Sequence, residues 1–216
     1  MTGTVPPTER QVLGWKFFAA AFLIGAASLT AIRPLLKRAP EPPPVLGQVP
    51  AFELVGADGK PFASSELAGR VYVANFFFTQ CPSICPTLMH SMAELGTALD
   101  EHHVDGVELV SISVDPDQDT PERLREYGAK VGAKAPRWRL LTGTRDPIVD
   151  LAEHGFKVPV GEAPASGANP YEIAHTGKFV LVDQRGRIRG YYERSPDWGM
   201  QELFERAQQV LGESHG

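Results

Sequence analysis

The feature that most constrains the fold is an apolar run, VYVANFFF (71–78), that leads directly into two cysteines. A continuous apolar run of this length is typical of a strand that is buried on both faces of a sheet. In the stretch that follows, 86–102, apolar residues recur at the spacing of a helix. The sequence therefore predicts a buried strand and a helix, joined by a turn that carries Cys81 and Cys85.

The chain after residue 51 repeats this alternation of strand and helix patterns. Thr120 and Pro121 mark the start of one helix, because threonine is a good N-cap and proline suits the first helical position. Strands alternating with helices, followed by a hairpin and a helix, give the order of a thioredoxin-like α/β fold. The further predicted elements are strands at 107–114 and 137–143, a helix at 146–156, a loop at 157–174, hairpin strands at 178–183 and 187–193, and a closing helix at 198–212.

The N-terminal region is predicted to be a polar tail, 1–13, and a membrane segment, 14–32. The segment holds the uncharged apolar run FFAAAFLIGAASLTAI and approaches the roughly 20 residues that cross a bilayer. No convincing cleavage site ends it, so we expect a transmembrane anchor or an uncleaved signal. A buried core helix is the alternative, but the run has no polar face. The flanking charges alone do not decide on which side of the membrane the rest of the chain lies.

Residues 33–50 are rich in proline and are predicted to form an extended linker to a single domain, 51–212. Two cysteines are too few for a disulfide-rich scaffold, so the domain relies on an ordinary apolar core. The first forty residues hold five basic side chains and one acidic side chain, while the whole chain has a net charge of −5. The domain is therefore acidic, which makes nucleic acid an unsuitable partner.

Cys81 and Cys85 are expected to be reactive. The N-terminus of a helix exposes unpaired N–H groups and the positive end of the helix dipole, and both favour a thiolate. At a spacing of four residues the two sulfurs could converge on one metal ion or oxidise to a disulfide. Two inert buried cysteines, or a purely structural disulfide, are the alternatives, which this corner between strand and helix disfavours.

Four separated motifs, FFFTQCPSICPTL, SVDPDQDTP, LLTGTRD and HTGKFVLVDQRGRI, resemble the Sco/SenC family of membrane-anchored copper-handling proteins, in the family's order. The resemblance runs from about residue 45 to residue 195. It implies a thioredoxin-like fold and copper bound by two cysteines and a distant histidine. By motif, these ligands fall on Cys81, Cys85 and His175.

The resemblance also implies a role in assembling the binuclear copper centre of cytochrome c oxidase. The expected partners are the copper-bearing subunit of the oxidase and other copper-handling proteins. The expected location is the bacterial inner membrane, with a single span and the C-terminal domain in the periplasm or another extracytoplasmic space.

Copper also suits the chemistry of the predicted ligands, since two thiolates and one imidazole form a soft set that binds copper(I) and can hold copper(II). Zinc is the rival metal, but a structural zinc site normally has four protein ligands and a fourth is not obvious. Met89, four residues after Cys85, is interpreted as core rather than as a thioether ligand. The histidines that compete with His175 are His90, His102, His103, His154 and His215.

Two positions depart from the family pattern. Ser83 stands where many relatives have an acidic residue between the cysteines, and Ala174 stands where many have an aspartate before the histidine. With less negative charge nearby, the site should favour copper(II) less. The acidic segment 115–122 is interpreted as a turn between strand and helix; alternatively, Asp115 or Asp119 supports the metal loop or a docking surface.

The leading hypothesis is a copper chaperone that delivers copper by ligand exchange, rather than an enzyme. The alternative is a thiol-disulfide oxidoreductase that uses Cys81 and Cys85 to reduce a partner's cysteines before metal loading. Three residues between the cysteines, where thioredoxin-type reductants usually have two, favour metal binding. His175 would be dispensable for a pure dithiol reductase.

Overall fold

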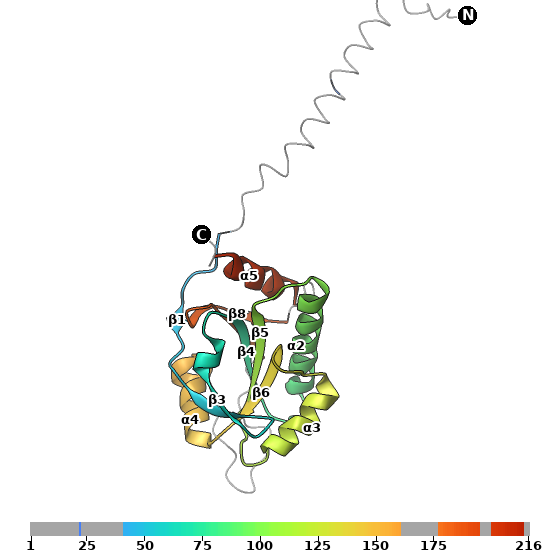
Figure 1. The fold of residues 1–216 in the computed structure, drawn as a ribbon, viewed down its shortest axis with the longest axis vertical. Helices are drawn as coiled ribbons and strands as arrows, with labels where there is room; N and C mark the ends of the chain where they lie inside the picture. Colours follow the sequence, from blue (N-terminus) through green and yellow to red (C-terminus); the bar gives the residue numbers. More distant parts are fainter. Residues whose placement is uncertain (1–21, 23–40, 161–176, 195–199, 214–216) are drawn as a thin grey trace, which may run out of the picture. The chain divides into compact units, whose positions relative to one another are not determined.

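The computed structural model describes residues 22, 41–160, 177–194 and 200–213. The chain divides at residues 41 and 42 into two units, and the fold described below is that of the second (Figure 1). Apart from Phe22, the predicted anchor lies outside the described residues, and so does His175. Within the described residues, no helix combines the length and the apolar character that a membrane span requires.

The second unit is a mixed α/β structure in the thioredoxin-like order that the sequence predicts. Its elements are β1 (Gly47–Gln48), β2 (Glu53–Gly56), β3 (Pro61–Ala63), the 3-10 turn η1 (Ser64–Leu67), β4 (Val71–Phe77), α2 (Ile84–Glu101), β5 (Val107–Ser113), α3 (Pro121–Val131), β6 (Trp138–Thr142), α4 (Arg145–Asp150), the π-helical turn η2 (Leu151–Gly155), β7 (Lys178–Val182), β8 (Arg187–Glu193) and α5 (Gln201–Gly212).

The strands of the described residues form one eight-stranded sheet in the order β1-β8-β7-β4-β5-β6-β2-β3. The central strands β4, β5 and β6 are parallel, and every residue of β4 and β5 is buried, as the apolar run 71–78 predicts for β4. Figure 1 shows α2 and α3 on one side of the sheet and α4 on the other. Because parallel strands end at the same edge, the segments that follow β4 and β5 meet there.

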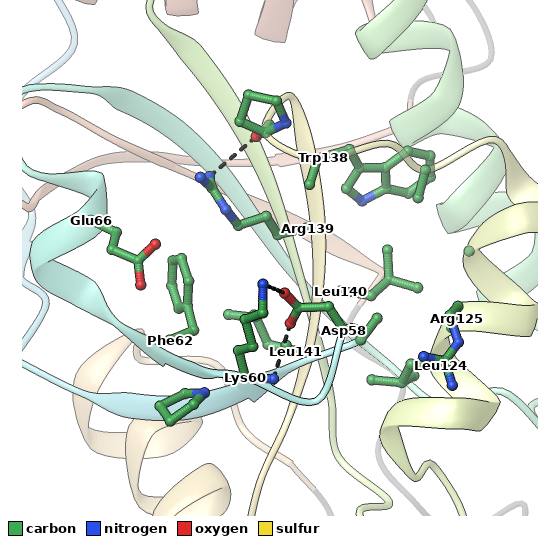
Figure 2. Close-up of a pocket in the computed structure, with 17 residues that line it drawn as sticks. Asp58, Lys60, Phe62, Glu66, Leu124, Arg125, Trp138, Arg139, Leu140 and Leu141 are labelled. Atoms are coloured by element: carbon green, nitrogen blue, oxygen red, sulfur yellow. Dashed lines mark hydrogen bonds and ion pairs between the residues drawn. The ribbon is translucent and has the colours of Figure 1, made fainter.

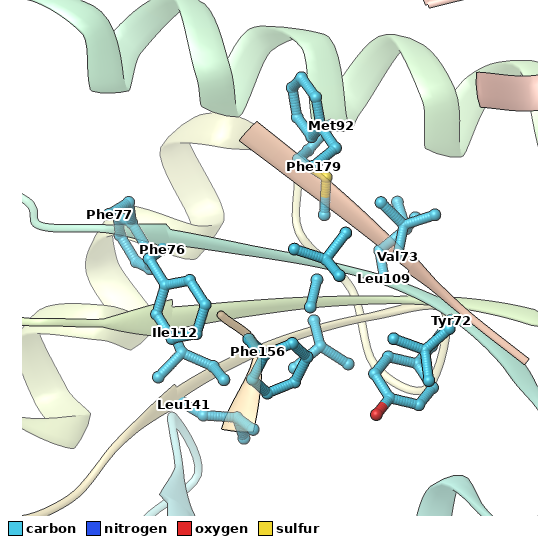
Figure 3. Close-up of a cluster of buried hydrophobic side chains, with 14 of the residues drawn as sticks. Tyr72, Val73, Phe76, Phe77, Met92, Leu109, Ile112, Leu141, Phe156 and Phe179 are labelled. Atoms are coloured by element: carbon cyan, nitrogen blue, oxygen red, sulfur yellow. The ribbon is translucent and has the colours of Figure 1, made fainter. Parts of the chain in front are cut away.

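The core has two halves, one on each face of the sheet. Phe76 makes an edge-to-face contact with Phe156, with ring centroids 5.4 Å apart, whereas its neighbour Phe77 stacks at 5.5 Å on Tyr127 of α3. Successive side chains of a strand point to opposite faces, so β4 supplies both halves. Figure 3 shows Met92 of α2 on one side of the strands and Phe156 on the other; both are fully buried.

Three features differ from the sequence expectations. The β2–β3 hairpin, which adds an edge to the sheet through β6, was not predicted, although its turn holds the typical pair Asp58-Gly59, with Gly59 at φ +79°. Helix α2 begins at Ile84, two residues earlier than predicted, so that Cys85 is helical. The predicted helix at 146–156 is divided between α4 and the π-helical turn η2.

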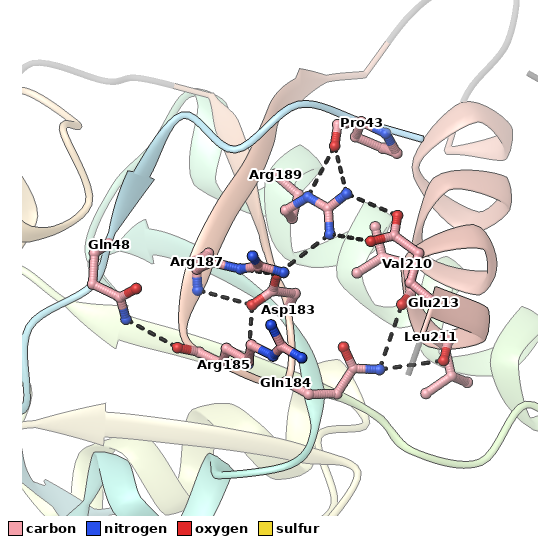
Figure 4. Close-up of polar contacts among 10 residues, drawn as sticks. All are labelled: Pro43, Gln48, Asp183, Gln184, Arg185, Arg187, Arg189, Val210, Leu211 and Glu213. Carbon is pink, nitrogen blue, oxygen red and sulfur yellow. Dashed lines mark hydrogen bonds and ion pairs between the residues drawn. The ribbon is translucent and has the colours of Figure 1, made fainter. Parts of the chain in front are cut away.

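Residues 42–50, which lie in the segment predicted as a linker, belong to the compact unit. Strand β1 pairs with β8, and the N–H of Leu46 donates to the carbonyl of Ile188 at 2.8 Å. The guanidinium of Arg189 donates to the carbonyl of Pro43 at 2.9 and 2.5 Å (Figure 4). This N-terminal strap, residues 42–49, is therefore fastened to β8.

Candidate functional site

The two cysteines lie at the corner between β4 and α2, as the sequence predicts. The N–H of Cys81 donates to the carbonyl of Phe78 at 3.3 Å and closes a turn directly after β4. Cys85 is the second residue of α2, and its N–H donates to the sulfur of Cys81 at 3.4 Å. Both thiols are free and buried: 6% of the surface of Cys81 and 3% of that of Cys85 is exposed. The sulfur of Cys81 thus accepts one of the unpaired N–H groups at the helix N-terminus.

In the structure the two thiols differ in the direction of their pKa shifts, whereas the sequence predicted that both would be activated. Burial opposes the ionisation of Cys81, but hydrogen bonds from the thiol and N–H of Cys85, followed by those from Ser83, outweigh it and lower the Cys81 pKa. Burial, then the hydrogen bond to Cys81 and the negative charges of Cys81 and Asp119, raise the pKa of Cys85 far above its usual range. Cys81 is therefore the more acidic thiol of the pair, and Cys85 holds its proton more strongly.

A buried carboxylate fastens the turn that precedes Cys81. Asp119, fully buried at the turn between β5 and α3, accepts hydrogen bonds from the N–H of Thr79 at 3.0 Å and from its hydroxyl at 2.5 Å. Ser113, at the end of β5, donates to the same carboxylate at 2.6 Å. Of the two alternatives for the acidic segment, the structure therefore supports contact between Asp119 and the cysteine-bearing loop. Thr79 and Ser113 were not predicted, because no local pattern distinguishes them.

A further side chain, from α3, lies close to both thiols. Tyr127 is half-buried, and burial, followed by the charges of Cys85, Cys81 and Asp119, raises its pKa to about 12. It is therefore a neutral phenol at physiological pH. Asp115, the other acidic candidate, pairs with Arg145 at 3.3 Å. No sequence signal marked Tyr127.

The chain after the predicted ligand His175 resumes beside the cysteines. Gly177 lies so close to the first turn of α2 that an added Cβ would stand 2.6 Å from Cδ1 of Ile84. Ile84 is the residue directly before Cys85. The described chain therefore re-enters the fold next to the thiols, two residues after His175 in the sequence.

Of the competing ligands, His215 lies outside the described residues, and those discussed below are placed elsewhere or are engaged in packing. Met89 is fully buried and accepts a hydrogen bond from the side chain of Asn75 at 3.7 Å, which agrees with its predicted core role. His90 and His154 are exposed and pair with carboxylates four residues away in the sequence, at 3.3 and 3.0 Å. The ring of His102 packs on Phe204. In the part of the chain that the structure describes, no group of three or more His, Cys, Asp or Glu side chains is placed to hold a metal ion.

A cavity of about 650 Å³ lies between the β2–β3 hairpin, β6 and α3 (Figure 2). Its walls include the buried side chains of Leu124, Trp138 and Leu140, and the ion pair of Lys60 with Asp58 at 3.6 Å lies at its rim. Neither cysteine lines this cavity. The thiol chemistry therefore belongs to the separate corner at the end of β4.

Comparison with known proteins places the chain in a family. A SCO2-like protein from Rickettsia conorii is 32% identical over 196 residues, which cover 85% of this chain and 92% of that protein. A protein from Stutzerimonas stutzeri that is named as copper-binding is 32% identical over 143 residues, or 66% of this chain and 68% of that protein.

The comparison with solved structures also finds a member of the Sco family. BsSco, described as a member of the Sco family of cytochrome c oxidase assembly proteins with a disulfide switch, matches with a TM-score of 0.68 and 27% identity, covering 79% of this chain and 98% of BsSco. The SCO1/SenC family model matches residues 43–211, which include both cysteines, Asp119 and His175. Because this match spans well over half of the sequence, the chain belongs to the SCO1/SenC family.

Proposed function

We propose that this protein binds copper through Cys81, Cys85 and His175 and delivers it to the binuclear copper centre of cytochrome c oxidase. The observation that carries the proposal is the pair of free, buried thiols, in which the N–H of Cys85 contacts the sulfur of Cys81. The name of the Stutzerimonas stutzeri relative supports copper as the cargo, and the family of BsSco supports the oxidase as its destination.

The donor set explains how copper could be both held and released. Two sulfurs and one imidazole suit copper(I) and leave open coordination positions through which a partner's ligands can attack. Cys81 is the first ligand in this mechanism, because its thiol ionises more readily than an ordinary thiol. Cys85 joins the metal with loss of its proton, so binding releases protons and weakens on acidification.

Metal analysis of wild type and of the His175→Ala variant tests the ligand set. Purified protein is loaded in parallel with copper(I), copper(II) and zinc, and His90→Ala serves as control, because His90 is exposed and pairs with Glu94. We expect one copper per wild-type and His90→Ala chain, and a large loss of affinity in His175→Ala. Equal copper binding in all three would show that His175 is not a ligand.

Delivery is tested in cells. A strain that carries only His175→Ala at normal abundance should fail to assemble active cytochrome oxidase at limiting copper. If the oxidase is assembled normally, delivery by this protein is the wrong mechanism.

A thiol-disulfide oxidoreductase is the second candidate function. The difference between the two thiols favours it, because a Cys81 thiol that ionises more readily than usual, beside a Cys85 that holds its proton more strongly, suits attack on a disulfide followed by resolution. In that mechanism Cys81→Ser and Cys85→Ser abolish the exchange, while His175→Ala leaves it intact. An oxidase defect in the cysteine variants but not in His175→Ala would select the reductase.

We also propose that residues 14–32 anchor the protein in the inner membrane, with the domain on the extracytoplasmic side. The support is the length and apolar character of that segment. After mild reduction of intact cells, a thiol reagent that cannot cross the inner membrane should label the cysteines. Labelling that occurs only after lysis would place the domain on the cytoplasmic side.

A further inference from the structure

Asp119 is an ionisable side chain that is buried without a cationic partner. None of its surface is exposed, and no lysine, arginine or histidine forms an ion pair with it within the described parts of the chain. Its stabilisation comes from the three hydrogen bonds that Thr79 and Ser113 donate, two to one oxygen and one to the other. Burying a carboxylate is costly, so hydrogen bonds of this kind are required to keep it there.

The carboxylate links the cysteine-bearing loop to a rigid part of the fold. The N–H of Asp119 donates to the carbonyl of Asp115 at 2.9 Å, and the next residue, Thr120, caps helix α3. On the other side, Thr79 lies inside the turn that the N–H of Cys81 closes on Phe78. Asp119 therefore holds the middle of this turn through both a backbone and a side-chain donor.

We propose that Asp119 is a positioning residue for the two thiols: by holding the N–H and the hydroxyl of Thr79, it fixes the turn from which Cys81 faces Cys85. This inference rests on the proposed copper-binding function. Asp119 acts through Thr79 and is not itself a ligand, because both of its oxygens are occupied by protein donors. Its contribution to the placement of the thiols is geometry, so a neutral side chain of the same shape should preserve that placement, although it removes the negative charge that helps to raise the Cys85 pKa.

Replacing Asp119 by asparagine and by alanine distinguishes the effect of its hydrogen-bond geometry from that of its charge. In Asp119→Asn, the amide oxygen can accept from the N–H of Thr79, while the amide nitrogen donates to the Thr79 hydroxyl, which can reverse its role. Asp119→Ala removes all three contacts and leaves the N–H of Thr79 without its acceptor. Thr79→Val removes the hydroxyl donor to Asp119 and a long hydrogen bond from the exposed Arg123 at 3.4 Å, but it keeps the N–H of Thr79 on the carboxylate. It provides a milder perturbation if the alanine variant does not fold.

Two measurements on the purified full-length protein test the inference. The first is copper affinity by competition, together with the optical and paramagnetic resonance spectra of the copper(II) form. We expect a loss of 10- to 100-fold and altered spectra in Asp119→Ala, as is typical when a side chain that orients metal ligands is removed. Thr79→Val should lose about tenfold, and Asp119→Asn should stay within about threefold of wild type with an unchanged spectrum.

The second measurement needs no copper. Cys81 and Cys85 are equilibrated with oxidised dithiothreitol: one S–S bond forms in the protein, and the two thiol hydrogens and two electrons reduce the reagent to its dithiol. A loosened turn lowers the effective concentration of one thiol at the other. The equilibrium constant for forming the protein disulfide should therefore fall about tenfold in Asp119→Ala and change less than about threefold in Asp119→Asn.

The control is Asp183→Ala, which removes another buried, hydrogen-bonded carboxylate. Asp183 follows β7 at the end of the sheet opposite to the cysteines, because Val182 pairs with Tyr72 near the start of β4. At temperatures where each variant is folded, both readouts should match wild type in Asp183→Ala.

Wild-type readouts in Asp119→Ala and Thr79→Val would overturn the inference, and so would an asparagine variant as impaired as alanine. If wild type binds no copper, the proposed function fails, and the disulfide equilibrium alone decides the role of Asp119.

Discussion

Replacing Arg189 by alanine should release the N-terminal strap and destabilise the domain. The guanidinium is 4% exposed and contacts three acceptors that come from distant parts of the sequence (Figure 4). It donates to the carbonyl of Pro43 at 2.9 and 2.5 Å, to the carboxylate of Glu213 at 2.6 and 2.7 Å, and to Asp183 at 3.3 Å. One side chain thus joins the strap, strand β8 and the end of α5.

The expected loss of stability follows from the interactions that each acceptor of Arg189 loses. Removing one partner of a buried ion pair costs about 3–5 kcal/mol. Asp183 keeps the side chain of Arg187 at 2.7 Å, and the side chain of Glu213 is 32% exposed and can turn to water, so the lower end applies. The carbonyl of Pro43 loses its charged donor without a replacement. We therefore expect a loss of about 3 kcal/mol, which at about 2–4 °C per kcal/mol lowers Tm by about 6–12 °C.

Denaturant and thermal unfolding of Arg189→Ala measure this loss, and Arg185→Ala is the matched control. Arg185 is an exposed arginine in the turn between β7 and β8, so its replacement should change stability by less than about 0.5 kcal/mol. Hydrogen exchange should also show faster opening of residues 42–49 in Arg189→Ala alone. Equal stability of the two variants, with unchanged exchange in the strap, would refute this account.

In reduced, copper-free protein, iodoacetamide should modify Cys81 in preference to Cys85 at neutral pH, because the pKa of Cys81 is lowered and that of Cys85 is raised. The thiolate of Cys81 stabilises the fold above its unfolded pKa, and this contribution disappears as the pH falls through the folded pKa. Equal modification of the two sites, read by mass spectrometry from pH 6 to 9, would contradict the difference. Ser91→Ala should leave stability unchanged or raise it by about 1 kcal/mol, because the Ser91 hydroxyl is buried and has no hydrogen-bond partner among the described residues. Ser113→Ala, which removes a donor to Asp119, should destabilise the protein by about 1–2 kcal/mol. Denaturant unfolding measures both serine variants, and a larger loss of stability in Ser91→Ala than in Ser113→Ala would contradict these expectations.

The sequence by itself determined the central part of the fold. The apolar run at 71–78 and the helical spacing after it specify a buried strand and its helix, because burial and periodicity are local properties of the chain. The Thr-Pro pair at 120–121 marks the start of α3, where the structure finds the Thr120 cap. The same local information placed Cys81 and Cys85 at the corner between strand and helix.

Other features depended on contacts between distant segments. The short strands β2 and β3 are stabilised by pairing with β6, and Pro43 and Arg189, which fasten the strap, are 146 residues apart. Composition identified residues 33–50 as extended, but it could not show that part of this stretch pairs with β8.

Within the site, only the tertiary structure decided how the two cysteines differ and which acidic residue supports them. Both cysteines are near a helix N-terminus, yet hydrogen bonds from Cys85 and Ser83 lower the pKa of Cys81, while burial raises the pKa of Cys85. Asp119 and Thr79 are 40 residues apart, and they meet because β4 and β5 are parallel neighbours whose ends share one edge of the sheet. No local pattern encodes such a contact, since it exists only once the sheet has formed.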